Sequence, residues 1–260
     1  MTVDALERLQ RIEAEVRRVG RVRVVELAVA LDVSEMTIRR DLDMLAEQGA
    51  VRRIRGGAVR TGPQPFAERF SRQVRAKDRI AAKLAGLVGD GGAIGIDAST
   101  TLLRLASQLD GGGVGAGVGA GVGVADLTVV TNGPDTFAAL QGQPGVTALL
   151  TGGRLDARTG SLVGPLATRS AQGLLLRRLF VSAAGVHPDH GTSENTLEDA
   201  EVKLALAAAA GEVVVAVDAS KLGQRAAARG LGPDRVALLV TELDPGDHRL
   251  DPYRSAWDLL

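Results

Sequence analysis

Residues 22–59 read VRVVELAVALDVSEMTIRRDLDMLAEQGAVRRIRGGAV, and the apolar spacing in this stretch decides the fold of the N-terminal part of the chain. Residues 25–31 fit a short helix, and the Asp-Val-Ser sequence that follows predicts a tight turn ending at Ser34. Serine is a favoured N-cap, because its hydroxyl accepts a hydrogen bond from a backbone N–H of the first helical turn. A second helix is therefore expected over residues 35–48, ending before Gly49.

The flanks of this stretch extend the pattern in both directions. Upstream, apolar residues at helical spacing predict a helix that Gly20 ends; they are Leu6, Leu9, Ile12, Val16 and Val19. Downstream, two short strand-like runs surround Gly56 and Gly57, which is a hairpin signal. The order helix, helix, turn, helix, hairpin predicts a small winged helix-turn-helix domain over residues 1–60.

The helix over 35–48 is the candidate recognition helix, because the last helix of a helix-turn-helix presents its N-terminal side chains to base edges in the major groove. If Ile38, Leu42 and Leu45 face the core, the outward side chains are Met36, Thr37, Arg40 and Met44, with Arg39 at the flank. Arginine binds guanine through two hydrogen bonds, and threonine contacts the methyl group of thymine. The alternative is a small helical bundle with arginines on its surface.

The hairpin carries Arg52, Arg53 and Arg55, which suit DNA phosphates or the minor groove. Residues 51–79 hold nine basic and two acidic side chains, a local charge of +7, although the 31 basic and 31 acidic residues of the whole chain cancel. Such a stretch in a neutral protein favours a polyanionic partner at that place. Charge alone fits a solvated linker as well.

Residues 22–59 resemble the winged helix-turn-helix of the DeoR family of bacterial transcriptional regulators. The matching motifs are ELA at 26–28, L-x-VS at 31–34, TIRRDL at 37–42, the glycine that ends the helix and R-x-x-GGA at 53–58. The resemblance implies binding to double-stranded operator DNA and, most often, repression of sugar-metabolism genes. It assigns Ser34, Thr37, Arg39 and Arg40 to the recognition helix, and Arg52, Arg53, Arg55, Gly56 and Gly57 to the wing. We expect Asp41 to orient an arginine or cap a strand, because a carboxylate repels phosphate.

From residue 77 the pattern changes to alternating strands and helices. Strands are expected at 93–97, 127–131, 146–150, 179–183, 212–217 and 236–241, and helices at 77–88, 100–109, 134–141, 165–176 and 198–210. Continuous apolar runs such as VVVAV indicate strands buried on both faces, hence a larger, mainly parallel α/β domain over 77–260. Residues 61–76 contain two prolines and are expected to be a linker, and the Gly-rich segment 111–123 a flexible insertion.

Polar residues follow several of the expected strands. The DASTT sequence at 97–101 follows a strand and opens a helix, so its hydroxyls and free N–H groups fit a phosphate; a plain Ser/Thr N-cap is the alternative. Because ligands of α/β sheets bind at the carboxyl ends of strands, we expect these ends to converge. The candidate effector-binding residues are Asp97, Ser99, Thr100, Thr101, Thr131, Asn132, Gly152, Gly153 and Lys221. Lys221 would supply positive charge, and Asp97 and Asn132 would bind sugar hydroxyls. Asp218 could take part in the site or, as readily, hold Lys221 in place.

This half of the chain is also similar to the effector domain of the DeoR family. The matching motifs include K-D-R-I-A at 77–81, DASTT at 97–101, TN at 131–132, GG at 152–153, E-V-K at 201–203 and D-x-SK at 218–221. That domain resembles sugar-phosphate isomerases, which implies a phosphorylated sugar as effector without requiring catalysis. The chain departs from the family's pattern in two places: the Gly-rich insertion, and the C-terminus, which lacks the apolar strand expected after residues 236–241.

Three functions are compatible with these features: a repressor that responds to a sugar phosphate, an isomerase-like enzyme with a fused DNA-binding domain, and an architectural DNA-binding protein. An enzyme needs a positioned acid and base. No acid–base pair stands out. The carboxylates near the start of the last helix could include one, but solvated acids at a helix start explain them better; these are Glu194, Glu198, Asp199 and Glu201. The HPDH sequence at 187–190 is expected to be a loop and not a metal site. The repressor is expected to be a homo-oligomer, dimer or higher, without a cofactor.

Composition excludes further classes. The chain has no cysteine, hence no disulfide or thiolate metal site, and its 2% aromatic content argues against single-strand binding by base stacking. The N-terminus alternates charges and lacks the apolar core of a secretory signal, and no run reaches the ~18 apolar residues of a membrane span. A cytoplasmic protein with no membrane partner is expected.

Overall fold

The computed structural model describes residues 3–47, 50–60, 66–109 and 124–260. Its contacts divide the chain into two units, Met1–Gln64 and Pro65–Leu260. The Gly-rich insertion expected at 111–123 and residues 61–65 of the expected linker lie outside the described residues. Within the described part of the chain, no helix has both the length and the apolar character that crossing a membrane requires.

The smaller unit has the predicted order of elements and one further strand. Its elements are α1 Val3–Val19, β1 Arg21–Arg23, α2 Val24–Ala30, α3 Glu35–Glu47, β2 Val51–Ile54 and β3 Gly57–Arg60. The strands form an antiparallel sheet in the order β1-β3-β2. The sequence did not reveal β1, because three residues are too few for a periodicity. A Cβ at Gly57 would lie 2.0 Å from the carbonyl oxygen of Val22, so the approach of β1 requires glycine there.

The core of this unit confirms the predicted inward face of α3. Ile38 and Leu42 are fully buried, and they belong to one apolar cluster with Ile12 of α1. Asp41 is only 5% exposed. Its two carboxylate oxygens accept hydrogen bonds from Arg8 Nε and Nη2, at 2.6 and 3.1 Å. Asp41 therefore orients an arginine as expected, and this pair joins α1 to the recognition helix.

The larger unit is an α/β domain. Its helices are α4 Phe66–Phe70, α5 Val74–Val88, α6 Thr100–Ala106, α7 Pro134–Leu140, α8 Pro165–Gln172 and α9 Leu197–Ala208. Its strands are β4 Gly92–Ile96, β5 Leu127–Thr131, β6 Val146–Leu150, β7 Arg154–Asp156, β8 Ser161–Val163, β9 Leu176–Val181, β10 Gly185–His187, β11 Gly191–Glu194, β12 Ala210–Ala216, β13 Ala228–Arg229, β14 Leu238–Val240 and β15 Asp258–Leu259. The segment expected as a linker already contains α4 and the first turn of α5.

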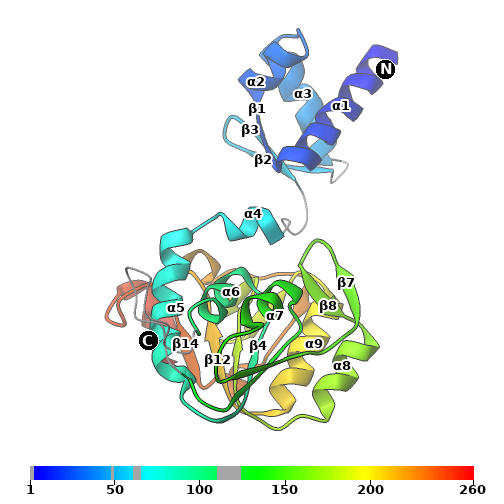
Figure 1. Cartoon of the computed structure of the whole chain (residues 1–260). Helices are drawn as coiled ribbons and strands as arrows, with labels where there is room; N and C mark the ends of the chain where they lie inside the picture. The colour runs from blue at the N-terminus through cyan, green and yellow to red at the C-terminus, as the bar shows by residue number, and fades with distance from the viewer. Residues whose placement is uncertain (1–2, 48–49, 61–65, 110–123) are drawn as a thin grey trace. The chain divides into compact units, whose positions relative to one another are not determined.

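Seven parallel strands form the main sheet, in the order β15-β14-β12-β9-β4-β5-β6. Helices α5, α6 and α7 supply the core on one face, and α8 and α9 supply it on the other (Figure 1). The VVVAV run is apolar throughout because β12 is covered on both sides: Val213 and Val215 face one core, Val214 and Ala216 the other. The chain leaves β4 toward β5 on one side and later returns to β9 on its other side. This is a topological switch point, where α/β sheets bind ligands.

A final strand is present although the sequence has no apolar run after β14. Strand β15 pairs in parallel with β14 and forms one edge of the sheet. Two buried aromatic residues that precede it, Tyr253 and Trp257, anchor it; their ring centroids lie 6.0 Å apart. A two-residue strand that begins with aspartate has no apolar pattern, so the sequence does not reveal the strand that completes this edge.

Candidate functional site

The exposed face of α3 carries most of the side chains predicted to reach DNA. Met36, Arg39 and Arg40 are exposed, and Thr37 is half-buried. Ser34 is the N-cap, as predicted: its Oγ accepts a hydrogen bond from the backbone N–H of Thr37 at 3.1 Å. The two hydroxyl oxygens of these residues are 2.9 Å apart. Hydrogen bonds therefore fix the polar groups of Ser34 and Thr37 at the start of the recognition helix, beside Arg39 and Arg40.

The side chains of this face differ in how they are held. Arg39 forms an ion pair with Glu35 at 2.7 Å. Arg40 has no hydrogen bond or ion pair within the described part of the chain, so its guanidinium is available to a base. Met44 was expected to point outward and does not: it is half-buried against the core cluster. Its long thioether side chain folds onto the apolar surface.

The hairpin of β2 and β3 separates its arginines by role. Arg53 Nε lies 2.8 Å from Asp43 Oδ1, and its Nη1 donates to the carbonyl of Gly57 at 2.9 Å. Arg52 and Arg55 are exposed, and their guanidinium groups make no polar contact with other described residues. The turn between the strands uses Gly56 with a φ of +77°, a backbone conformation that favours glycine. Arg53 thus braces the wing onto α3, whereas Arg52 and Arg55 are available for phosphates.

We expect Arg40→Ala to weaken binding to the specific DNA site by about 1–3 kcal/mol, with little loss on random DNA, because a base contact is lost. Arg52→Ala should weaken both equally and lower the salt slope by about one unit. Fluorescence anisotropy at several salt concentrations separates the two. An equal loss on specific and random DNA with Arg40→Ala would make Arg40 a phosphate contact instead.

In the larger unit, polar residues at the ends of three adjacent strands are tied together. Asp97 follows β4, Asn132 follows β5 and Ser182 follows β9. Asn132 Oδ1 accepts a hydrogen bond from the backbone N–H of Ala98 at 3.0 Å, and Asp97 Oδ2 accepts one from the backbone N–H of Ser182 at 3.0 Å. The ends of β4 and β5 therefore meet as predicted, the end of β9 joins them, and this point is the switch point of the sheet.

Lys203, on α9, is buried beside two carboxylates at this point. Its Nζ lies 2.8 Å from Glu194 Oε2 and 3.3 Å from Asp97 Oδ2, and it donates to the carbonyl of Ser182 at 2.8 Å. The other oxygens of the two acids, Asp97 Oδ1 and Glu194 Oε1, are buried without a hydrogen-bond partner among the described residues. Leaving a buried acceptor unpaired costs free energy. A donor such as a ligand hydroxyl or a water molecule would satisfy these oxygens.

Burial and charge shift the pKa values of this cluster in opposite directions. Burial raises the pKa of Glu194 to about 7, and Lys203 only partly opposes it. Burial alone would lower the pKa of Lys203, but Glu194, Asp97 and Asp199 raise it overall. The ammonium is therefore charged near neutrality, whereas Glu194 is close to its titration point.

We expect the stability of the larger unit to fall as the pH rises from about 4.5 to about 7. In this window folded Glu194 holds a proton that the unfolded chain, with its ordinary pKa of 4.5, has released, so the folded state loses relative stability. Urea unfolding at several pH values, compared with Glu194→Gln, measures this. The exposed Glu198→Gln is the control, and a Glu194→Gln variant with the same pH slope as wild type would contradict the assignment.

Three of the predicted site residues hold the loops of the site in place. Ser99 Oγ accepts a hydrogen bond from the backbone N–H of Leu102 at 3.2 Å, so Ser99 is the N-cap of α6. This matches the alternative of a plain Ser/Thr N-cap that the sequence left open. Thr131 Oγ1 accepts from a backbone N–H two residues later at 3.0 Å. Asn132 uses its remaining amide group to donate to the carbonyl of Leu162 at 3.2 Å. Thr100 and Thr101 are buried in the first turn of α6.

The glycines after β6 both have left-handed backbone, with φ of +71° at Gly152 and +120° at Gly153. A Cβ at Gly153 would lie 2.8 Å from the carbonyl oxygen of Val163, so glycine is required for packing against β8. A Cβ at Gly152 would meet no atom within 4 Å. Gly153 is therefore structural, and Gly152 borders open space at the strand end.

Lys221 is half-buried and is not held by Asp218, contrary to the expectation. Asp218 Oδ1 accepts from the backbone N–H of Ser220 at 3.1 Å and caps a 3-10 turn. In the described structure no carboxylate lies within 4 Å of the Lys221 ammonium, which leaves it available to an anion. The positive charge of Lys221 also contributes to lowering the pKa of Lys77, which burial chiefly lowers to about 8.

Sequence reasoning missed the acidic residues on and before α9. The sequence predicts Glu194 and Asp199 as solvated acids at a helix start, but both are buried, and Asp199 Oδ1 accepts from Ser161 Oγ at 2.8 Å. Asp199 and Lys203 lie four residues apart on α9, next to the apolar residues Ala200 and Val202, and this spacing is a weak signal that an exposed surface pair would give as well. Among the described residues no cluster of three His, Cys, Asp or Glu side chains could hold a metal ion.

Comparison with known proteins covers nearly the whole chain. The DeoR-like helix-turn-helix domain matches residues 8–64, and the DeoR C terminal sensor domain matches residues 72–243. The HTH-type transcriptional regulator GolR of Listeria innocua is 31% identical over 227 residues, covering 86% of this chain and 85% of that protein. The HTH-type transcriptional repressor GlcR of Bacillus subtilis is 28% identical, with coverages of 92% and 89%. The lactose phosphotransferase system repressor of Streptococcus mutans is 29% identical, with 93% of each chain covered.

These matches decide between the alternatives left by the sequence. The relatives are named as transcriptional regulators or repressors and not as enzymes, so the isomerase-like enzyme is not favoured. The helix-turn-helix match removes the alternative of a helical bundle with incidental surface arginines. The chain is a DNA-binding transcriptional regulator with a C-terminal sensor domain, and it belongs to the DeoR family.

Proposed function

We propose that this regulator represses carbohydrate-metabolism genes and that a phosphorylated sugar releases it from its operator. The observation that carries the effector half of the proposal is the buried cluster at the switch point, where Asp97 and Glu194 each have an unpaired oxygen beside Lys203. The name of one relative, the lactose phosphotransferase system repressor, supports repression of sugar genes, and the relative GlcR is likewise named a repressor. Because its partner is DNA, the protein is proposed to act in the cytoplasm.

The two ends of a sugar phosphate suit different parts of this site. Sugar hydroxyls would donate to Asp97 Oδ1 and Glu194 Oε1, the two buried acceptors without a partner among the described residues. The phosphate would lie at the DASTT loop, where it would accept from backbone N–H groups and the hydroxyls of Thr100 and Thr101, and the ammonium of Lys221 would supply the positive charge. Hydrogen bonds between ionised groups are about twice as strong as neutral ones.

Calorimetry tests the effector class directly. Pentose and hexose phosphates should bind more tightly than the same sugars without phosphate, and Thr100→Ala and Lys221→Ala should weaken only the phosphorylated forms. Lys83→Ala is the matched control, because the Lys83 ammonium donates to the carbonyl of Leu243 at 2.6 Å and makes no other hydrogen bond or ion pair with the described residues. Parent sugars that bind as well as their phosphates would refute the proposed effector class.

The proposed functional unit is a homo-oligomer, dimer or higher, held together by the larger units. Strand β6 is an edge of the main sheet, and its residues Val-Thr-Ala-Leu-Leu include no charge that would block pairing with a second copy. Leu149 and Leu150 on this strand, and Leu155 and Leu166 beside it in sequence, are exposed. An unprotected apolar edge favours association between copies of the chain.

We expect sedimentation velocity of the full chain at micromolar concentration to show a dimer or a larger species. Leu149→Glu should shift it toward monomer, because a charge on an edge strand opposes pairing. Leu175→Glu is the control, since Leu175 is 91% exposed and lies just before β9 instead of at the β6 edge. A monomeric wild-type chain would contradict the oligomer, and an unchanged Leu149→Glu variant would contradict this interface.

A further inference from the structure

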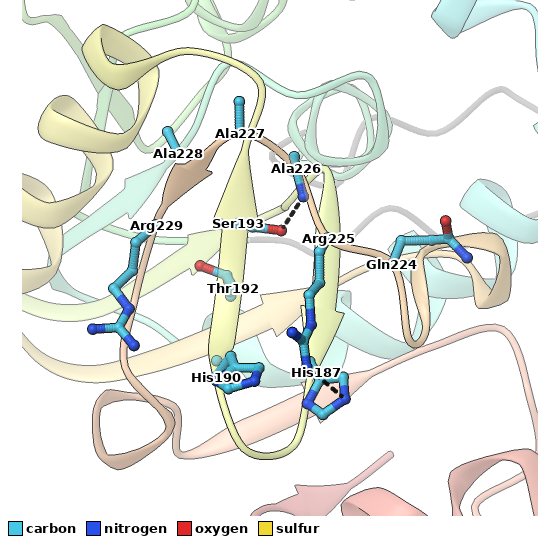
Figure 2. Close-up of a pocket in the computed structure, with 11 residues that line it drawn as sticks. His187, His190, Thr192, Ser193, Gln224, Arg225, Ala226, Ala227, Ala228 and Arg229 are labelled. Atoms are coloured by element: carbon cyan, nitrogen blue, oxygen red, sulfur yellow. Dashed lines mark hydrogen bonds between the residues drawn. The ribbon is translucent and has the colours of Figure 1, made fainter.

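A small three-stranded sheet, β10-β11-β13, carries a cluster of basic side chains that the proposed effector site does not use. Figure 2 shows the segment 224–229 passing around β11, with Arg225 and Arg229 on either side of this strand. His187 and His190 lie near the turn of the β10–β11 hairpin, and their rings are stacked with centroids 4.9 Å apart. Together these four side chains line a hollow of about 240 Å³.

The hollow has an excess of positive charge. The described residues that line it include both arginines and both histidines and no acidic residue. Arg225 and Arg229 are exposed, and no described carboxylate lies within 4 Å of either guanidinium. Asp189 is the acidic residue of the hairpin turn, and its carboxylate lies 3.7 Å from the far nitrogen of His187, Nδ1. Arg225 and Arg229 therefore bring two positive charges to one hollow where no described carboxylate neutralises them, which favours an anion there.

The histidine at the base of the hollow presents a donor to it. The backbone N–H of Asp189 donates to His187 Nδ1 at 3.2 Å, so the neutral ring carries its proton on Nε2. That Nε2 lies 3.4 Å from Arg225 Nη2. Both groups are then donors close to one another, and one acceptor oxygen that binds to both from the side of the hollow would satisfy them.

Strand β11 gives the hollow a fixed floor and separates it from the effector site. Ser193 and Arg229 are direct partners across β11 and β13, so their side chains share the face of the hollow. Ser193 Oγ accepts from the backbone N–H of Ala226 at 2.9 Å and fixes the segment that carries Arg225. The next residue, Glu194, points to the opposite face of the strand, where it pairs with Lys203 at 2.8 Å.

We propose that this hollow is a second anion site, which binds the phosphate group of a small phosphomonoester between Arg225 and Arg229, with His187 Nε2 as a third donor. Guanidinium groups match phosphate oxygens in pairs of hydrogen bonds. The volume of about 240 Å³ is below that of pockets for drug-sized ligands, ~300–1,000 Å³, and fits a phosphate on a short carbon chain. The site stands independently of the proposed effector site, because the two share no residue.

The chain offers its own reporters for this site. Its three histidines are His187 and His190 in the hollow and His248 elsewhere, with an 89% exposed side chain. We would titrate glycerol 3-phosphate into the full chain at constant pH and ionic strength and follow the imidazole C–H signals by NMR. The signals of His187 and His190 should shift saturably, and that of His248 should stay. Sodium chloride at matched ionic strength should move none of them.

Variants then locate the binding. Arg225→Gln with Arg229→Gln should raise the dissociation constant for glycerol 3-phosphate by tenfold or more, ~1.4 kcal/mol, the scale of one lost charged hydrogen bond. The exposed Arg79→Gln is the matched control. Lys221→Ala, in the proposed effector site, should leave the histidine shifts unchanged, so failure of one site is distinguished from failure of the other. Shifts that do not saturate, that include His248 equally, or that survive the double substitution would overturn the proposal. Citrate binding as tightly as the phosphomonoester would overturn the phosphate assignment.

Discussion

Lys203→Met will destabilise the larger unit by about 3–5 kcal/mol, the typical cost of removing one partner from a buried ion pair. The ammonium lies within 3.3 Å of both Asp97 and Glu194, so its loss leaves two buried acids without their counter-ion. Trp257 is the sole tryptophan of the chain and is buried in this unit. Its fluorescence during urea unfolding reports the change in the free energy of unfolding.

Two further variants show whether the charge is responsible. Adding Glu194→Gln to Lys203→Met should restore part of the stability, because a neutral amide does not need the ammonium. Lys83→Met removes a half-buried lysine that donates to a backbone carbonyl at 2.6 Å, and it should cost much less. If Lys203→Met unfolds at the same urea concentration as wild type, the buried network does not have the energetic role assigned to it.

Asp97→Asn will reduce affinity for the phosphorylated sugar by about 10–100-fold and leave operator affinity without sugar unchanged. A hydrogen bond to a charged acceptor contributes about 1.5–3 kcal/mol, and the amide takes away that charge. The variant keeps the shape of the side chain, so a change confined to sugar binding separates recognition from folding. Calorimetry with the sugar phosphate and anisotropy with operator DNA measure the two affinities.

The same substitution at an exposed site controls for charge alone. Asp135→Asn, on α7, should change neither affinity, because Asp135 is exposed and stands in the first turn of that helix. Urea unfolding of Asp97→Asn shows whether the domain is intact. An Asp97→Asn protein that binds the sugar phosphate within twofold of wild type would remove Asp97 from the site.

The elements with a repeated apolar pattern were predictable from the sequence. Strands 127–131 and 146–150 were placed without error, because they are apolar runs bounded by turn residues. The inward face of α3 and the cap at Ser34 followed from spacing and from the preference of serine for N-caps. Elements of two to four residues, such as β1, β13 and β15, were missed, since tertiary contacts and not periodicity hold them in place.

The candidate effector site was predictable where its residues follow strands and hidden where they lie on a helix. Asp97 and Asn132 were found because polar residues directly after buried strands are conspicuous. Lys203 and Asp199 sit on α9, where an acid and a lysine four residues apart also fit an exposed surface pair. Only the burial of this face of α9 shows that the ammonium of Lys203 pairs with Glu194, which lies on strand β11. Sequence spacing contains no information about that contact.

The coupling between sugar binding and operator binding is the most direct test of the proposed release of the repressor by a phosphorylated sugar. The operator would first be selected from random DNA by the purified protein, and its affinity then measured by anisotropy with and without pentose and hexose phosphates. A phosphorylated sugar should weaken operator binding by ~5–150-fold, ~1–3 kcal/mol, and operator should weaken sugar binding by the same factor. The unphosphorylated sugar should have no effect. Operator affinity that no phosphorylated sugar changes, or that the parent sugar changes equally, would contradict the account.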